Sequence, residues 1–367
     1  MKILYDHQIF TSQKYGGISR YFYELVREFN DIQEVTCEIP LVVSNNHYIS
    51  DKKIVDYIDL FPNKQFRGKH RIFNYLNKPN TILKLKQQNF DIFHPTYYDP
   101  YFLKNLGDKP FVLTVHDMIH EKFSEMFPAA DKTTEQKRLL VEKAAKIIAI
   151  SQSTKEDLVE LFGTDESKIE VVYHGNSMFP KSDIKIRFDL PEKYLLFVGS
   201  RGGYKNFERF INSVAGLLKK DKELFVLCAG GGKFSSKEIQ NFTELEISKQ
   251  VMQYNLDDDS LAYFYENALF FIFPSLYEGF GIPILESFAC GCPLLCSSTS
   301  SLPEIAGDCS CYFDPYSEDS IEAAITKLLE DDELRKKLIA KGHERLKLFS
   351  WEQTAEQTKR VYESVIK

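Results

Sequence analysis

The chain has 367 residues, a length typical of two domains, and it is 43% hydrophobic and 27% charged, which is a globular rather than a disordered composition. Its formal net charge of −7 argues against general nucleic-acid binding, which requires a basic surface.

The start of the chain lacks the pattern of a secretory signal. Residues 3–5 are apolar, but Asp6 and His7 follow at once. The longest apolar runs, such as 268–273, are far shorter than the ~20 residues of a membrane-spanning helix. We therefore expect the chain to stay in the cytoplasm.

Short apolar runs alternate with amphipathic stretches in the first half of the chain. We expect strands at residues 3–5, 111–115, 146–150 and 169–173, and a helix at 18–29. Ser153 and Glu156 have capping-box spacing, which predicts that a helix opens there and ends at Phe162.

A second series of the same kind follows residues 176–192, which contain two prolines and little periodicity. We expect strands at 194–198, 224–228, 269–273 and 293–296, helices at 205–218 and 282–289, and helices through most of 317–366. Strands that alternate with helices predict parallel sheets covered on both faces. The fold class is therefore α/β, with two Rossmann-like, doubly wound domains at 1–180 and 190–349 that face each other across a cleft. We expect the last helix, 350–367, to pack back on the first domain.

The segment between the expected strand 269–273 and the expected helix 282–289, together with that helix, contains two carboxylates and two glycines. Glu278 precedes Gly279 and Gly281, and Glu286 lies within the helix. Glycines let a ligand approach the backbone, and a helix N-terminus offers free N–H groups to phosphates or hydroxyls. Two carboxylates there could hold sugar and ribose hydroxyls; two surface glutamates beside a loop are the structural alternative.

The Glu-x₇-Glu spacing resembles the motif of retaining glycosyltransferases of family four, which have the GT-B fold. Four more segments agree in the family's order: YGGISRY at 15–21, LTVHDMI at 113–119, FVGSRGGYKN at 197–206 and FSW at 349–351. The pattern is most similar to the bacterial mannosyltransferase-type branch that builds surface polysaccharides.

The resemblance assigns site residues across both domains. It implies catalytic roles for Glu278 and His116. It implies donor binding by Gly16, Gly17, Arg201, Lys205, Gly279, Phe280, Gly281, Leu285 and Glu286, and it puts Val251 and Met252 near the nucleobase. Fixed cations at Arg201 and Lys205 would stabilise the leaving diphosphate. The family's usual arginine follows the glycine directly, where this chain has Ser200. For Arg201 and Lys205 the structural alternative is an ordinary basic start of a helix. For Gly16 and Gly17 it is a plain glycine turn.

The implied reaction is hexose transfer with retention, by front-face attack in which the leaving phosphate acts as base. The nucleotide-sugar is a substrate, so we expect no cofactor and no metal. We favour mannose from GDP-mannose, passed to a glycan or lipid-linked acceptor. A UDP-sugar-dependent transferase, a nucleotide-sugar epimerase and a non-catalytic sugar-nucleotide-binding protein are the alternatives.

Residues 64–86 form a basic segment without an acidic residue. The seven cations are Lys64, Arg67, Lys69, Arg71, Lys78, Lys84 and Lys86, and Phe66, Phe73 and Tyr75 lie among them. Such a segment suits peripheral contact with an anionic membrane surface. An ordinary solvated helix face explains the charges equally well.

Cysteine pairs at 290/292 and 309/311 raise the possibility of a zinc site. Zinc ligands are usually spaced more widely and lie in loops, whereas Cys290 and Cys292 flank Gly291 at an expected helix end. We interpret the cysteines as buried free thiols.

Overall fold

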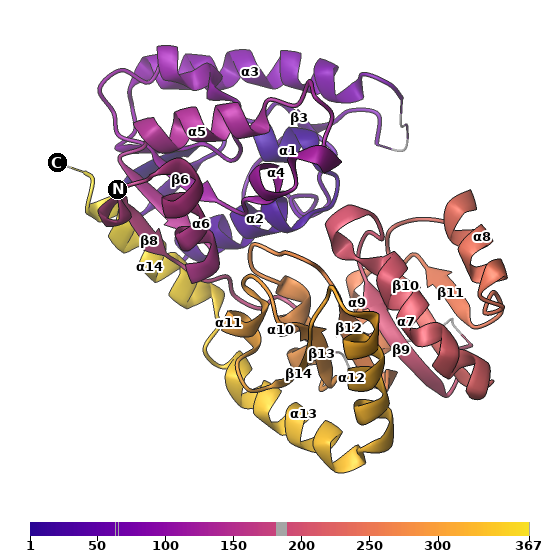
Figure 1. Cartoon of the computed structure of the whole chain (residues 1–367). Coiled ribbons are helices and arrows are strands. Elements are labelled where there is room, and N and C mark those ends of the chain that lie inside the picture. Colours follow the sequence, from indigo (N-terminus) through magenta and orange to yellow (C-terminus); the bar gives the residue numbers. More distant parts are fainter. Residues whose placement is uncertain (63, 65, 181–188, 367) are drawn as a thin grey trace. The chain divides into compact units, whose positions relative to one another are not determined.

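The computed structural model describes residues 1–62, 64, 66–180 and 189–366 (Figure 1). These residues form two compact units, one of residues 1–175 with 350–367 and the other of residues 176–349. Most of the expected link between the domains, residues 181–188, lies outside the described residues. No helix in the described ranges is long and apolar enough to cross a membrane.

Parallel strands form the centre of the first unit. One sheet has the order β2-β1-β5 and another the order β6-β7-β8, and a parallel bridge between Phe93 and Phe111 joins them. A small parallel pair, β3-β4, is separate. The strands are β1 (Lys2–Tyr5), β2 (Thr36–Glu38), β3 (Val43–Ser44), β4 (Ile58–Asp59), β5 (Ile92–His94), β6 (Val112–Val115), β7 (Lys146–Ala149) and β8 (Ile169–Val171).

The helices of the first unit include the end of the chain. They are α1 (Gln8–Ser12), α2 (Gly17–Asn30), α3 (Lys69–Gln87), α4 (Ile119–Lys122), α5 (Thr133–Lys143), α6 (Gln152–Phe162) and α14 (Trp351–Glu363), with 3₁₀ turns at Pro100–Lys104, Ser124–Met126 and Glu166–Lys168. The helix α14 packs against α2. Its Tyr362 hydroxyl lies 3.1 Å from the Tyr5 hydroxyl and 2.6 Å from His94 Nδ1 within the core. These contacts make α14 part of the first unit.

The start of α6 differs from the sequence-based prediction. Ser151, not Ser153, is the N-cap, and its hydroxyl accepts a hydrogen bond from the Thr154 N–H at 3.0 Å. The expected capping box at Ser153 and Glu156 is therefore wrong. The reason is that β7 ends at Ala149, only two residues before Ser151, so the helix has already begun when the chain reaches Ser153.

One six-stranded parallel sheet, in the order β11-β10-β9-β12-β13-β14, organises the second unit. If its strands are counted along the chain, the order is 3-2-1-4-5-6, that of a Rossmann fold. The strands are β9 (Lys193–Val198), β10 (Leu224–Ala229), β11 (Val251–Tyr254), β12 (Phe270–Phe273), β13 (Leu294–Ser297) and β14 (Ser310–Phe313). The strand order reverses between β9 and β12.

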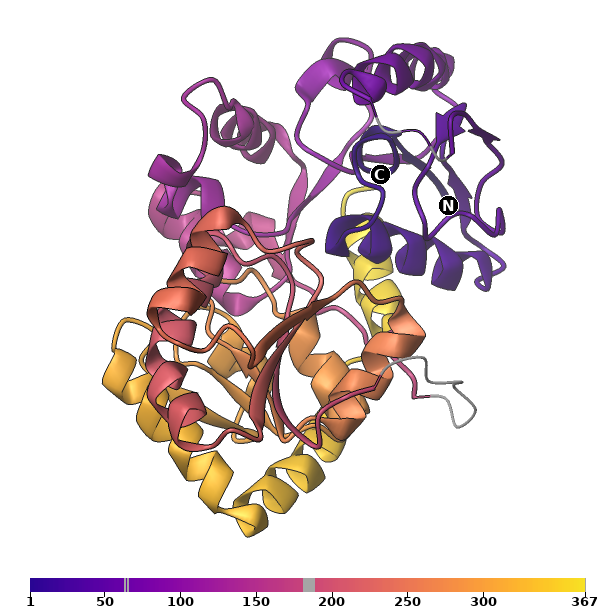
Figure 2. The ribbon, with the colours of Figure 1, turned by 90° about the vertical axis from the view of Figure 1, so that its right-hand side faces the viewer.

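Helices cover both faces of this sheet (Figure 2). They are α7 (Phe207–Lys220), α8 (Ser236–Glu244), α9 (Asp258–Asn267), α10 (Ile282–Ala289), α11 (Leu302–Ala306), α12 (Glu318–Glu330) and α13 (Asp332–Leu346), with a 3₁₀ turn at Gly203–Lys205. The helices α7 and α12 pack together on the face that carries Phe270 and Ile272. On the opposite face, the ring of Tyr265 in α9 meets the edge of Phe271 at 5.3 Å. Since β12 is buried on both faces, its sequence is a continuous apolar run.

Candidate active site

Three loops come together beyond the carboxyl ends of β9, β12 and β13. The Leu276 N–H donates to the Tyr204 carbonyl at 2.7 Å, which ties the loop after β12 to the loop after β9. The Thr299 hydroxyl donates to the Leu276 carbonyl at 3.0 Å, which adds the loop after β13. In open α/β sheets, ligands bind beyond this edge and at the point where the strand order reverses. The three loops meet at that point.

Lys205 and Glu278 form an ion pair across the reversal of strand order. Lys205 follows β9 and Glu278 follows β12, and Lys205 Nζ lies 2.6 Å from Glu278 Oε1. The carboxylate residue is only 9% exposed, and the ammonium group also lies 5.7 Å from the ring centre of Phe273. A cation and an anion held side by side in a sheltered position can bind a ligand that carries both phosphates and hydroxyls.

Two serines that the sequence-based prediction did not include hold the Glu278 loop. The Glu278 N–H donates to Ser300 Oγ at 3.0 Å. The buried Ser301 hydroxyl donates to the carbonyls of Glu278 at 2.9 Å and Phe280 at 3.0 Å. The serine-rich run 297–301 directly after a strand was the available signal. These bonds fix the backbone on which the Glu278 carboxylate is mounted.

The glycines of this loop make room for the turn into α10. Gly281 is the N-cap of α10 and has φ of 101°, in the left-handed region. A Cβ atom there would also lie 3.0 Å from Leu302 Cδ2. Both effects favour glycine. Gly279 is buried beside it.

Glu286 lies on α10 and is 7% exposed. The Tyr265 hydroxyl lies 3.3 Å from its Oε2. Leu285 and Phe280, by contrast, are buried apolar side chains, and Phe280 packs edge-on against Phe349. Of these three predicted donor-binding residues, only Glu286 has a side chain with polar chemistry to offer; the other two pack the loop and helix into place.

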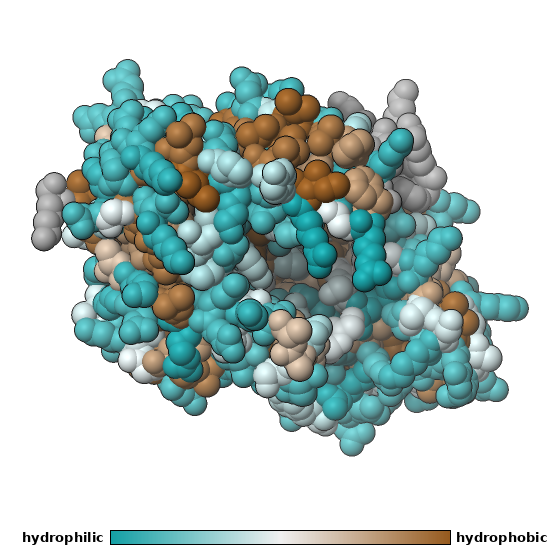
Figure 3. Space-filling model, turned by 90° about the horizontal axis from the view of Figure 1, so that it is seen from above, coloured by the Kyte–Doolittle hydropathy of each residue, from teal (hydrophilic) through white to brown (hydrophobic). Residues whose placement is uncertain are grey.

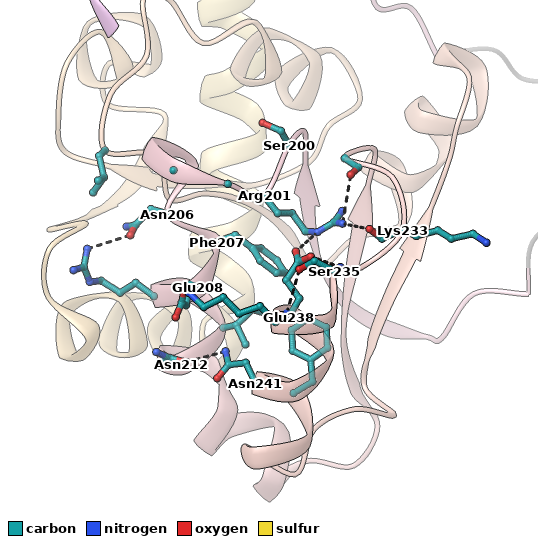
Figure 4. Close-up of a pocket in the computed structure, with 18 of the residues that line it drawn as sticks. Ser200, Arg201, Asn206, Phe207, Glu208, Asn212, Lys233, Ser235, Glu238 and Asn241 are labelled. Carbon is teal, nitrogen blue, oxygen red and sulfur yellow. Dashed lines mark hydrogen bonds and ion pairs between the residues drawn. The ribbon is translucent and has the colours of Figure 1, made fainter. Parts of the chain in front are cut away.

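Arg201 is used differently from the sequence-based expectation (Figure 4). Its guanidinium donates to Glu238 at 2.6 Å and to the carbonyls of Gly230 and Gly232 at 3.0 and 2.9 Å. Gly230, Gly231 and Gly232 all have positive φ. In this structure Arg201 therefore holds the glycine turn after β10 to the start of α8, while Lys205 alone of the two predicted cations pairs with Glu278.

A cavity of about 820 Å³ lies beside this turn, between α7 and α8. Its lining includes Arg201, Asn206, Asn212, Lys233, Glu238 and Asn241. Neither Lys205 nor the two glutamates of the motif are among its lining residues. The cavity thus adjoins the loop after β9 but is not centred on the Lys205–Glu278 pair.

Val251 and Met252 lie in the first half of β11. Val251 is part of the hydrophobic core and pairs in register with Val226. The carboxyl end of this strand, where a ligand would lie, is formed by Tyr254. The structure therefore places both predicted nucleobase neighbours within the strand rather than at its ligand edge.

In the first unit, Gly16 and Gly17 open α2. Gln13 reaches this helix start, and its Oε1 accepts from the Ser19 N–H at 3.3 Å. A Cβ atom on Gly16 would lie 2.3 Å from Gln13 Oε1, so the missing side chain makes room for this amide. The helix start thus already has one polar side chain at its N–H groups.

His116 follows β6 and is 6% exposed. Burial, assisted by His174, His94 and Lys137, holds its pKa well below the usual value, so the imidazole is neutral. Its backbone N–H donates to the Tyr98 hydroxyl at 3.1 Å. Within the described residues, the buried Nε2 atom has no hydrogen-bond partner. A neutral ring nitrogen in that condition is suited to a hydroxyl group.

The basic segment 64–86 is only partly a charged surface. Lys69 is buried, and its ammonium donates to the carbonyls of Phe61 at 2.7 Å and Lys64 at 2.9 Å. Phe73 is 2% exposed and belongs to the interior. The prediction that these two contribute to a membrane surface is wrong, because α3 turns both toward the protein.

All seven cysteines have free thiols, and Cys228, Cys290, Cys292, Cys296 and Cys309 are buried. In the part of the chain that the structure describes, no three His, Cys, Asp or Glu side chains are grouped so as to hold a metal ion.

Comparison with known proteins follows the division into two units. Residues 15–176 match the family model Glycosyltransferase Family 4, and residues 178–345 match Glycosyl transferases group 1. The O-antigen chain mannosyltransferase B of Escherichia coli is 26% identical over 377 aligned positions, which cover 94% of this chain and 95% of that protein. The N-acetylgalactosamine-N,N'-diacetylbacillosaminyl-diphospho-undecaprenol 4-alpha-N-acetylgalactosaminyltransferase of Campylobacter jejuni is 30% identical over 215 positions, 58% of each chain.

Among solved structures, the sucrose-phosphate synthase of Thermosynechococcus elongatus superposes with a TM-score of 0.76 at 19% identity. The match covers 99% of this chain and 98% of that one. At this identity the likeness shows a shared fold.

Proposed function

Because this chain belongs to the family 4, group 1 glycosyltransferases and has their GT-B fold, we propose that it transfers mannose from GDP-mannose, with retention of configuration, to a glycan or lipid-linked acceptor in surface polysaccharide synthesis. The Lys205–Glu278 ion pair at the reversal of strand order carries this proposal. The pair supplies a cation for the diphosphate and a carboxylate for the sugar, the two groups that the reactive glycosidic bond of a nucleotide-sugar joins.

Lys205 neutralises the diphosphate as the glycosidic bond breaks. Negative charge on the leaving phosphate grows in the transition state, so a fixed ammonium group stabilises that state more than the ground state. Glu278 accepts hydrogen bonds from the transferred sugar, and Glu286 accepts them from the ribose. Support comes from the low exposure of both carboxylates, since a sheltered acceptor forms stronger hydrogen bonds.

His116 contacts a hydroxyl of the donor sugar. Its neutral ring and its buried Nε2 support that role, because burial penalises a charged imidazole but leaves its hydrogen-bonding capacity intact. In this proposal the acceptor attacks from the face that the phosphate leaves, and the phosphate oxygen takes the acceptor's proton. No protein nucleophile, cofactor or metal ion takes part.

The choice of mannose and of the acceptor class is supported by relatives. The Escherichia coli relative is named a mannosyltransferase of the O-antigen chain, and the Campylobacter relative's name contains a diphospho-undecaprenol acceptor. A UDP-sugar donor is the second candidate, since the latter relative transfers a different sugar.

Calorimetric titration with GDP, UDP and ADP, followed by their mannose, glucose and N-acetylgalactosamine conjugates, tests the donor. We expect the tightest binding for GDP and GDP-mannose. Tighter binding of a UDP-sugar would overturn the assignment of GDP-mannose as the donor. NMR of the sugar released by slow donor hydrolysis tests the stereochemistry, because retention yields the donor's anomer first. Release of the opposite anomer would overturn the front-face mechanism, and conversion to an epimer without release would contradict the transfer reaction.

A further inference from the structure

The helix α3 has an inverted pattern: its buried face is anchored by polar side chains. Asn77 Oδ1 accepts from the Val43 N–H at 2.9 Å, and Asn77 Nδ2 donates to the Val43 carbonyl at 2.9 Å. His7 bonds two more polar residues of α3, Thr81 through Nδ1 at 2.8 Å and Asn74 through Nε2 at 2.9 Å. These bonds hold the helix on the first unit without requiring a large apolar inner face.

The opposite face of α3 exposes apolar side chains to solvent. Ile72 is 43% exposed, Leu76 38% and Leu83 54%, and Pro79 is also exposed. Steps of four, three and four residues put them in one stripe along the helix. Tyr75, 79% exposed, lies beside the stripe. Figure 3 looks down on the side of the molecule where α3 lies and shows hydrophobic side chains grouped among hydrophilic ones.

The turn that leads into α3 extends this apolar surface. Phe61 and Phe66 are 40% and 41% exposed, and their rings meet edge to face at 5.5 Å. The buried Lys69 ammonium holds the carbonyl of Phe61, so the turn is tied to the first residue of the helix. The exposed apolar surface therefore includes both the turn and the stripe.

Positive charge surrounds the surface, though less than the sequence suggests. Lys78 pairs with Asp99 at 3.5 Å, and Lys84 pairs with Glu38 at 2.7 Å. The side chains of Lys64, Arg67, Arg71 and Lys86 are exposed. Because residues 64–86 contain no acid, every charge within the segment is positive.

We propose that this surface, the exposed stripe of α3 with Phe61 and Phe66, docks on an anionic lipid bilayer, with α3 lying flat at the level of the headgroups. The apolar side chains enter the boundary of the acyl chains while the four exposed cations meet lipid phosphates. A second copy of the chain is a poorer partner, since a two-fold contact would set two acid-free segments against each other. The inference does not depend on which sugar is transferred.

The test is co-sedimentation with phosphatidylcholine vesicles, with and without phosphatidylglycerol, at low and high salt. We expect binding to the anionic vesicles that weakens at high salt, because exposed charges are screened. Replacing Arg67, Arg71 and Lys86 together by Ser should lower partition roughly a hundredfold, as each cation adds about 1 kcal/mol. Leu76→Ser with Leu83→Ser should lower it at both salt concentrations, about tenfold or more. Lys69 is left intact, because its substitution would disturb the turn.

Matched control variants distinguish binding through this surface from non-specific binding to vesicles. Ile239→Ser removes an apolar side chain that is 52% exposed on α8, and Lys219→Ser with Lys220→Ser removes cations from the end of α7. Both controls should bind as the wild type does. Equal binding to neutral and anionic vesicles, absence of binding to either, or unchanged binding of the α3 variants would overturn the proposal. So would a lipid-free dimer in analytical ultracentrifugation that Leu76→Ser with Leu83→Ser abolishes. Melting temperatures of the variants confirm that they fold.

Discussion

Lys205 and Glu278 are 73 residues apart in the chain, yet Lys205 Nζ lies 2.6 Å from Glu278 Oε1. They follow two strands, β9 and β12, that are neighbours in the sheet although β10 and β11 come between them in sequence. The pair therefore exists because of the strand order, and it occupies the place where an open α/β sheet binds its ligand.

Replacement of Lys205 by Ala should lower turnover about 10²- to 10³-fold while the chain still folds. Loss of one charge-assisted contact to the leaving diphosphate in a sheltered site is worth ~2–4 kcal/mol of transition-state stabilisation. Steady-state kinetics with the preferred donor measure the effect. Lys219→Ala, at the exposed end of α7, is the matched control and should keep full activity. Near wild-type turnover of the Lys205 variant would remove this residue from the site.

Substitutions of the two glutamates of the motif should affect different quantities, turnover in one case and nucleotide binding in the other. Glu278→Gln should mainly depress turnover, since this carboxylate is assigned to the transferred sugar and to the Lys205 ion pair. Glu286→Gln should mainly weaken the binding of GDP-mannose and of bare GDP. Kinetics combined with nucleotide calorimetry separate the two, and Glu266→Gln on the exposed side of α9 serves as control. The reverse pattern would mean that the two roles are exchanged.

Arg201→Ala should destabilise the second unit more than it slows the chemistry. The substitution leaves Glu238 and the carbonyls of the Gly230–Gly232 turn without their shared donor. Since Glu238 is partly exposed, we expect a loss of about 2 kcal/mol in unfolding free energy and a melting temperature lower by several degrees. Turnover should stay within about tenfold of the wild type.

Lys233→Ala is the control for Arg201, because the Lys233 side chain points away from the turn in Figure 4. It should leave both the melting temperature and turnover unchanged. A hundredfold loss of turnover in the Arg201 variant, with an unchanged melting temperature, would instead assign Arg201 to the diphosphate.

Excess chelator should leave activity intact. In the proposed site the diphosphate charge is met by Lys205 and by backbone N–H groups at the start of α10, so a divalent cation is redundant. Initial rates before and after exhaustive treatment with EDTA measure this. Complete loss of activity, restored by Mg²⁺ or Mn²⁺, would contradict the metal-free site.

Acid should destabilise the first unit through its buried histidines. Burial lowers the pKa of His94 and of His174 to about 3, and it holds the pKa of His116 well below its usual value. Unfolding exposes these rings, whose pKa then returns to about 6.5, so the unfolded state binds more protons below that pH. Their stabilising contribution is complete above pH 6.5 and is lost as the pH falls toward 3.

Between pH 7 and pH 5, His94 and His174 should each remove about 2 kcal/mol from the unfolding free energy, and His116 should act in the same direction. Urea unfolding at several pH values measures the slope, and NMR of the imidazole protons should show neutral rings for as long as the fold persists. A flat stability profile between pH 7 and pH 5 would show that these rings are not buried as described.

Much of the fold was readable from local pattern. The helix predicted at 282–289 is found as Ile282–Ala289, and the continuous apolar run at 269–273 contains β12, Phe270–Phe273. Burial on both sheet faces leaves that signature in a strand. The strands β2, β3, β4, β5, β11 and β14 were missed, because a run of only two to four residues shows too weak a periodicity to be recognised.

The sequence by itself determined the α/β class, the two series of elements, the family and the segments proposed to contain the site. Only the tertiary structure decided which side chains in those segments meet. Arg201 and Lys205 are four residues apart, yet one bonds the glycine turn after β10 and the other bonds Glu278. Likewise, only packing decided that α3 turns Lys69 and Phe73 inward and Leu76 and Leu83 outward. Periodicity and capping act within a few residues, whereas strand order and the direction of a side chain depend on the free energy of packing the whole unit.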